Sequence, residues 1–157
     1  MAQQPAISLP SESGDERIRS AQNSVVARMA ANIAAARSTI LTAGRVEDGL
    51  TCRVEQGKFN AVLDLGPGMG GGAAGPSPGF FARAAIVGCV AIAVKMLAAR
   101  RGVAFRTVDV SVEMDSDDAA LFGMGTGRAA PLETRIGIDI TTDATDSIVR
   151  DIVDQAL

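Results

Sequence analysis

Two cysteines are the residues of this chain best suited to chemistry. Cys52 and Cys89 are its only thiols, and there is no His, which excludes Ser-His-Asp and Cys-His catalysis and His-ligated zinc. A cysteine reacts as its thiolate, and a nearby cation or a helix N-terminus lowers the thiol pKa. The function therefore depends on whether either cysteine has such a neighbour.

Cys89 lies in the middle of a long apolar segment. On a helix, the residues three and four positions away are Ala85, Ile86, Ile92 and Ala93, all apolar. The expected helix begins about three turns earlier, too far for its dipole to stabilise a thiolate. The helix itself therefore predicts a buried, structural cysteine, and an activating cation must come from another element or another subunit.

Arg53 and Arg83 are the candidate cations. Arg53 follows Cys52 on an expected strand, where alternation sends the two side chains to opposite faces. Arg53 can thus serve a helix packed on its own face, or be a solvated edge charge, while Cys52 is a half-buried strand residue. Arg83 lies inside the apolar segment, where a charge needs an acidic partner, a pocket or a subunit boundary. The two cysteines can pair only if their Cα atoms lie within about 7 Å.

A glycine-rich segment, residues 66–71, matches the pattern G-x-G-x-x-G. The strands before it are expected to be antiparallel, no helix follows at once, and the positions about 20 residues later are apolar rather than acidic. We therefore interpret it as a flexible loop that rims a pocket, not as a dinucleotide site. The acidic turns 47–48 and 115–118 lack the spacing of a calcium loop, so no metal or cofactor is expected.

Composition narrows the class of protein. The 157 residues are 47% hydrophobic, which is typical of one globular domain, expected over 13–157 after a flexible tail at 1–12. A net charge of −3, five Phe and no Trp or Tyr argue against nucleic-acid binding. Residues 1–19 have no apolar core that would direct export, so we expect a cytoplasmic protein with reduced thiols.

The apolar segment 80–99 has the length of a membrane span. Arg83 and Lys95 lie inside it, and each charge costs about 3 kcal/mol at the centre of a bilayer. The segment is therefore predicted to be a core helix, and no membrane partner is expected.

The elements around these residues follow from periodicity and capping. Ser13 and Glu16 form a capping box before an amphipathic helix that runs to about Arg37, and its alanine-rich side is expected to pack on the domain or on a second copy of the chain. Strands are expected at 38–46, 50–55 and 59–65 as an antiparallel meander. Pro76 and Pro78 precede a helix over 79–101.

The C-terminal part alternates in the manner of strands. Residues 108–114 and 136–140 alternate apolar and polar side chains, and a polar loop is expected between them over 115–130. Thr145 precedes a last helix with one apolar face. The order of helix, three strands, helix, two strands and helix predicts an α+β fold.

Several motifs then carry a resemblance: Gly75-Pro76-Ser77-Pro78, the apolar helix with Gly88-Cys89, and the segments 98–103 and 108–112. From about Leu41 to its end the chain resembles the OsmC/Ohr family, named for osmotically inducible protein C and organic hydroperoxide resistance protein. The resemblance implies an intertwined homodimer, with antiparallel sheets around long buried central helices and sites at the subunit boundary. Here it would carry an extra N-terminal helix.

The resemblance also implies a role for Cys89. In the active members of the family, the cysteine at this position attacks the peroxide as a thiolate held by an arginine and a glutamate, and a C-terminal cysteine resolves the product. Arg53 is the nearest match to that arginine. Gly79 and Phe80 stand where the glutamate is expected, and no cysteine follows Cys89.

Two functions follow from these observations. The first is thiol-dependent reduction of organic or hydrogen peroxide through Cys89 in stress defence, with Arg53 or Arg83 as the cation and Cys52 or an external thiol reductant as the resolving group. The alternative is a non-catalytic dimer of the same fold that binds a small apolar ligand beside the central helix.

Overall fold

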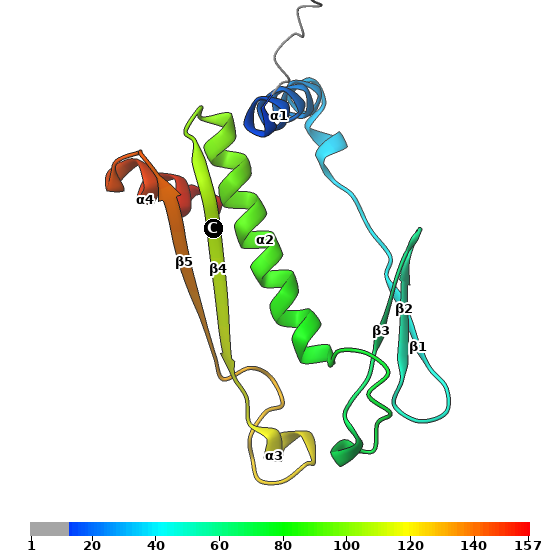
Figure 1. The fold of residues 1–157 in the computed structure, drawn as a ribbon. Helices are drawn as coiled ribbons and strands as arrows, with labels where there is room; N and C mark the ends of the chain where they lie inside the picture. The colour runs from blue at the N-terminus through cyan, green and yellow to red at the C-terminus, as the bar shows by residue number, and fades with distance from the viewer. Residues whose placement is uncertain (1–12) are drawn as a thin grey trace, which may run out of the picture.

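The computed structural model describes residues 13–157, so the predicted flexible tail at 1–12 lies outside the described residues. The fold is α+β, as predicted, with the elements in the predicted order (Figure 1). Three short elements are added: the 3-10 turns Ile33–Ala36 and Pro67–Met69, and the helix α3. In chain order the main elements are α1 (Gly14–Ala31), β1 (Ala43–Val46), β2 (Cys52–Gln56), β3 (Phe59–Leu63), α2 (Pro78–Arg100), β4 (Phe105–Asp115), α3 (Asp118–Leu121), β5 (Glu133–Thr142) and α4 (Asp146–Ala156).

Helix α1 starts at the predicted capping box. The Ser13 hydroxyl accepts from the Glu16 N–H at 3.2 Å, and the Glu16 carboxylate accepts from the Ser13 N–H at 2.8 Å. The helix ends at Ala31 and not at about Arg37, because Asn32 leaves the helical conformation with φ −150°. The Asn32 side chain then accepts from the Ala34 N–H and starts a 3-10 turn, Ile33–Ala36.

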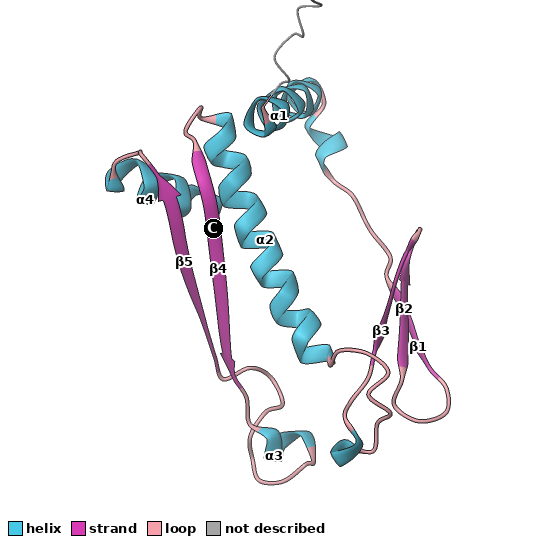
Figure 2. Ribbon diagram, viewed as in Figure 1, coloured by secondary structure: helices cyan, strands magenta, loops and turns pink. Residues whose placement is uncertain are grey.

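Strands β1, β2 and β3 form the predicted antiparallel meander, shown in Figure 2 apart from the β4–β5 hairpin. The prediction of a strand from Ser38 is wrong, since pairing begins only at Ala43. Ala43 pairs with Glu55, next to the end of β2, so residues 38–42 have no strand to pair with. They remain an extended connection between α1 and the sheet.

Helix α2 begins where Ser77 caps it, with the Ser77 hydroxyl accepting from the Phe80 N–H at 3.2 Å. Strands β4 and β5 pair along their length and pack on one face of α2, which also contacts α4. The connection predicted as a loop contains the short helix α3, which begins where the Asp117 carboxylate accepts from the Ala119 N–H at 3.0 Å.

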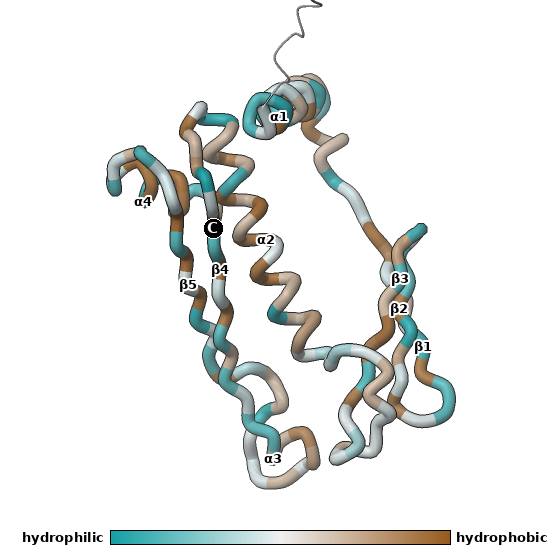
Figure 3. The backbone as a smooth tube through the Cα atoms, in the orientation of Figure 1, coloured by the Kyte–Doolittle hydropathy of each residue, from teal (hydrophilic) through white to brown (hydrophobic). Residues whose placement is uncertain are grey.

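The core lies between α2, the β4–β5 hairpin and α4. Hydrophobic residues alternate with polar ones along β4 and β5 (Figure 3). The central buried residues are Val90, Val94, Ala98, Phe105 and Ile152. Within the single chain α2 is therefore buried where it meets β4 and α4, and α1 covers part of its C-terminal half, whereas the sheet β1–β3 makes no extensive contact with it.

Among residues 13–157, α2 is also the one helix long and apolar enough to cross a membrane. Arg83 and Lys95 lie within it, and the Lys95 ammonium pairs with Asp15 of α1 at 2.8 Å. One face packs on β4. Internal charge pairing together with a packed face is typical of a core helix.

Candidate functional site

Cys89 lies at the middle of α2 and is exposed in the single chain. Its neighbours Val90 and Val94 are buried toward β4, while Cys89, Ala85 and Ile92 point away from the core. The prediction of a buried thiol is thus wrong for one chain, because nothing in that chain covers this face of the helix. The thiol is accessible to a substrate or to another subunit.

Arg83 does not lie beside Cys89 of the same chain. The two residues are six positions apart, which on a helix is about 9 Å along the axis and about 120° around it. The Arg83 guanidinium reaches back to the start of α2, where a Cβ added at Gly79 would lie 3.3 Å from its Nη1 atom. Arg83 is half-buried and makes no ion pair with the described residues.

Arg53 lies on one face of the sheet β1–β3, directly opposite Arg45 of β1. Both line an open cleft of about 650 Å³ together with Thr51 and Glu55. Arg45 pairs with Glu47 at 3.3 Å, whereas Arg53 makes no ion pair within residues 13–157. Glu47, Asp48 and Glu55 line the same cleft, so its two cations are accompanied by three carboxylates.

Sequence reasoning missed Arg45. The signal that could have found it was the turn at 47–49, which fixes the register of β1 on β2 and places residue 45 opposite residue 53.

Cys52 lies on the opposite face of the sheet from Arg53, as alternation predicts. It is half-buried and pairs with Val46 on one side and Leu63 on the other, in an apolar face. Both cysteines are free, and β2 makes no extensive contact with α2. The structure therefore does not bring Cys52, Arg53 and Cys89 together within one chain.

The glycine-rich loop before α2 is built around a buried carboxylate. Asp64 is 2% exposed and accepts from the backbone N–H groups of Leu65, Gly72 and Ala74 at 2.7, 3.2 and 3.1 Å. It also accepts from the Thr51 hydroxyl at 3.0 Å. Within residues 66–71, the N–H groups of Met69, Gly70 and Gly71 donate to backbone carbonyls of the same loop, so they are not available to bind a phosphate.

The loop is therefore anchored by Asp64, and the prediction of a flexible loop is wrong. Asp64 itself was missed, although one acidic residue between two leucines before a glycine run is a visible signal for it.

Replacing Asp64 by Asn should lower the melting temperature by several degrees at pH 7, because an amide accepts fewer of these hydrogen bonds. The N–H groups, first that of Ala74, lower the pKa of Asp64 below its usual value. A lowered native pKa stabilises the fold above the unfolded pKa of about 3.9, and this contribution is lost as pH falls through the native value. Urea unfolding from pH 7 to pH 2 should show the difference between wild type and D64N shrinking below about pH 4. A constant difference would contradict this assignment.

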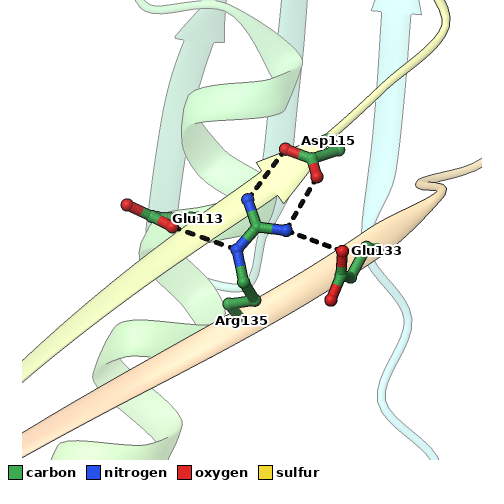
Figure 4. A network of polar contacts seen from close by, with 4 residues as sticks. All are labelled: Glu113, Asp115, Glu133 and Arg135. Atoms are coloured by element: carbon green, nitrogen blue, oxygen red, sulfur yellow. Dashed lines mark hydrogen bonds and ion pairs between the residues drawn. The ribbon is translucent and has the colours of Figure 1, made fainter.

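A second polar cluster lies across the end of the β4–β5 hairpin (Figure 4). Arg135 donates to both oxygens of Asp115 at 2.7 and 2.9 Å, and also contacts Glu113 at 3.1 Å and Glu133 at 2.8 Å. The hydrogen bonds from Arg135 lower the pKa of Asp115. Asp115, expected to be a solvated turn charge, is thus part of an ion-pair network that joins the two strands. In the described part of the chain, no group of three or more His, Cys, Asp or Glu could hold a metal ion.

Residues 70–157, more than half of the chain, match the family model described as OsmC-like protein. The chain belongs to the OsmC-like family. The matched residues of this OsmC-like chain include Gly75–Pro78, Arg83 and Cys89, and they leave out α1 and the sheet that carries Arg53 and Cys52. A comparison with curated protein sequences found no match.

Solved structures agree with this OsmC-like fold. An OsmC-like protein from Mycoplasma pneumoniae aligns with a TM-score of 0.64 at 12% identity, covering 76% of this chain and 80% of that one. An organic hydroperoxide resistance protein from Elizabethkingia anophelis, with thiocyanate bound, aligns at 0.52 and 18% identity, covering 76% and 81%. A candidate organic hydroperoxide resistance protein from Vibrio cholerae, with captopril bound in one of its active sites, aligns at 0.51 and 18%, covering 76% and 79%.

Proposed function

We propose that the protein is a homodimeric, thiol-dependent reductase of organic or hydrogen peroxide in which Cys89 is the nucleophile. The observation that carries the proposal is the exposed position of Cys89 on the central helix of an OsmC-like chain. The Cys89 thiolate attacks the terminal peroxide oxygen, the O–O bond breaks, and the leaving alkoxide takes a proton to become an alcohol. The cysteine is left as a sulfenic acid.

The surface area of the chain supports a homodimer. The chain exposes 11853 Å², whereas a compact monomer of 16.1 kDa exposes about 7,400 Å². Residues 1–12 can account for at most about 1,800 Å² of the excess, the surface of a fully extended segment of that length. At least about 2,600 Å² is left, which is on the scale that obligate homodimers bury.

The exposed apolar side chains also support a second copy of the chain as the partner. One uncovered face of α2 carries Ile92, which is more than half exposed, together with the exposed Cys89. A second copy that covers α2 also brings its own sheet toward Cys89. Arg53, together with Arg45, is then the cation that favours the thiolate of the other subunit, while Arg83 remains a candidate from the helices.

An external thiol fits the resolving step better than Cys52. Arg53 and Cys52 lie on opposite faces of the sheet, so the face that offers a cation to Cys89 turns Cys52 away. The external thiol attacks the sulfenic acid, releasing water and forming a mixed disulfide. A second thiol of the same reductant then restores Cys89 and leaves as a disulfide.

Mass spectrometry after treatment with cumene hydroperoxide tests the proposal. We expect oxidation at Cys89, trapped as a dimedone adduct, and little at Cys52. With a dithiol reductant, Cys89→Ser should lower peroxide turnover at least 100-fold, whereas Cys52→Ser should keep it. A Cys89 thiol that stays unmodified in excess peroxide would refute the proposal.

The second candidate is a non-catalytic dimer that binds a small apolar ligand at the same helix. The observation that favours it is the apolar surrounding of Cys89, with Ala85 and Ile92 on its face and Gly79 where a glutamate is expected. Captopril in an active site of the Vibrio cholerae structure shows that a structural neighbour holds a small molecule. Ligand binding retained in Cys89→Ser, with no turnover in either protein, would favour this function.

A further inference from the structure

Helix α1 is fastened to the C-terminal half of α2 by polar contacts (Figure 1). Asp15 pairs with Lys95 at 2.8 Å, and the Arg19 guanidinium donates to the Ala99 carbonyl at 2.9 Å. The Gln22 amide contacts the Met96 sulfur at 3.3 Å. No residue of α1 is fully buried, although Ile18, Val25 and Met29 are half-buried, so a thin apolar stripe and these polar contacts together hold the helix in place.

The contact between α1 and α2 closes a ring of elements, here called the contour. From α1 the chain passes through residues 32–42, here called the arm, to the sheet β1–β3 at the opposite end of α2, and returns along α2 to α1 (Figure 1). No other extensive contact joins opposite sides of the contour, since the sheet does not pack on α2. Only the α1–α2 contact closes it.

The arm does not have the composition of a simple linker. Every residue of the arm is exposed, and Ile33, Ile40 and Leu41 are between 69% and 82% exposed. Such side chains in an extended segment are costly in water and suit contact with another apolar surface. The face of α2 that carries Cys89 and Ile92 is left uncovered as well.

We propose that the arm lies across a second copy of this chain and that α1 acts as the latch that holds it there. The inference rests on the homodimer proposed above, and the exposed apolar side chains of the arm are part of the surface that the second copy covers. A subunit enclosed in this way leaves only after α1 releases α2. The contacts of Asp15 and Arg19 therefore govern how fast subunits exchange.

Native mass spectrometry of mixed, isotopically labelled dimers measures that rate. The variant Asp15→Asn/Arg19→Ala should exchange subunits at least tenfold faster than wild type. Arg28→Ala is the matched control, because Arg28 is an exposed cation of the same helix. Equal rates in the latch variant and wild type would overturn the inference.

A cross-link tests whether subunits exchange faster because an enclosed subunit is released or only because the variant chain is less stable. In a Cys52→Ser/Cys89→Ser background, Gln22→Cys and Met96→Cys can be joined by a short bismaleimide, which fixes α1 on α2. Exchange should then fall at least tenfold relative to the same variant without the reagent, and an unchanged rate would overturn the latch. Sedimentation of the wild type shows which proposal has failed. A monomer refutes both the dimer and the latch. A dimer whose subunit-exchange rate is unchanged in the latch variant refutes the latch alone.

Discussion

The double replacement Arg45→Ala/Arg53→Ala should lower the rate constant for Cys89 oxidation by cumene hydroperoxide 10- to 100-fold at pH 7. An opposite charge within about 4–6 Å lowers a thiol pKa by about 1–3 units, and the thiolate is the reacting species. Both arginines line one cleft, and Arg53 has no ion-pair partner within residues 13–157. Stopped-flow mixing with the peroxide measures the rate constant, and a double variant that keeps the wild-type value would contradict the role of these arginines.

Two variants make this result specific. Lys58→Ala removes a cation from the tip of the same sheet, where Lys58 lies over the Phe59 ring, and should leave the rate constant for Cys89 oxidation unchanged. Arg83→Ala should have a small effect, because its guanidinium lies over the first turn of α2. A large loss in Arg83→Ala together with a normal double variant would assign the cation to the helix instead.

Replacing Gly75 by Ala should destabilise the fold by about 3–5 kcal/mol and lower the melting temperature by about 10 °C. A Cβ at this position would lie 2.1 Å from the Val62 carbonyl oxygen and 2.8 Å from its carbon, which are backbone atoms of β3. The same stretch is tied to the sheet where the Asp64 N–H donates to the Pro76 carbonyl at 3.2 Å. The loop must therefore move off the strand to admit the methyl group.

Gly68→Ala is the control for that prediction. No atom lies within 4 Å of a Cβ built on Gly68, so the substitution should change the melting temperature by less than about 2 °C. Differential scanning calorimetry of both variants measures the difference. Equal melting temperatures for Gly75→Ala and wild type would show that the loop does not pack against β3 as described.

Local signals in the sequence predicted the elements well. The capping box at Ser13, the start of α2 at Pro76 and Pro78 and the alternation along β4 each depend on residues within one turn or one strand. The same signals predicted that Cys52 and Arg53 lie on opposite faces. What they missed depends on register or on distant hydrogen bonds, as for Arg45 opposite Arg53 and for the N–H groups around Asp64.

The prediction that Cys89 is buried failed for a different reason. Its apolar neighbours in sequence predicted burial, yet Ala85 and Ile92 face away from the core of the chain. Apolar composition shows that a helix face is to be covered, but not whether the cover comes from the same chain. For Cys89 the described part of the chain supplies no cover, and the proposed second copy is what would supply it.

The contact between Arg19 and Ala99 also has a consequence for the order of assembly. It joins residues 80 positions apart, so α1 leaves the ribosome long before its docking site exists. During that interval the arm is open, and the closing contact is among the most non-local in the chain. In the proposed dimer, the arm of a newly made subunit is therefore open to its partner until α2 is complete, and a subunit that binds at that stage does not have to wait for α1 to release α2.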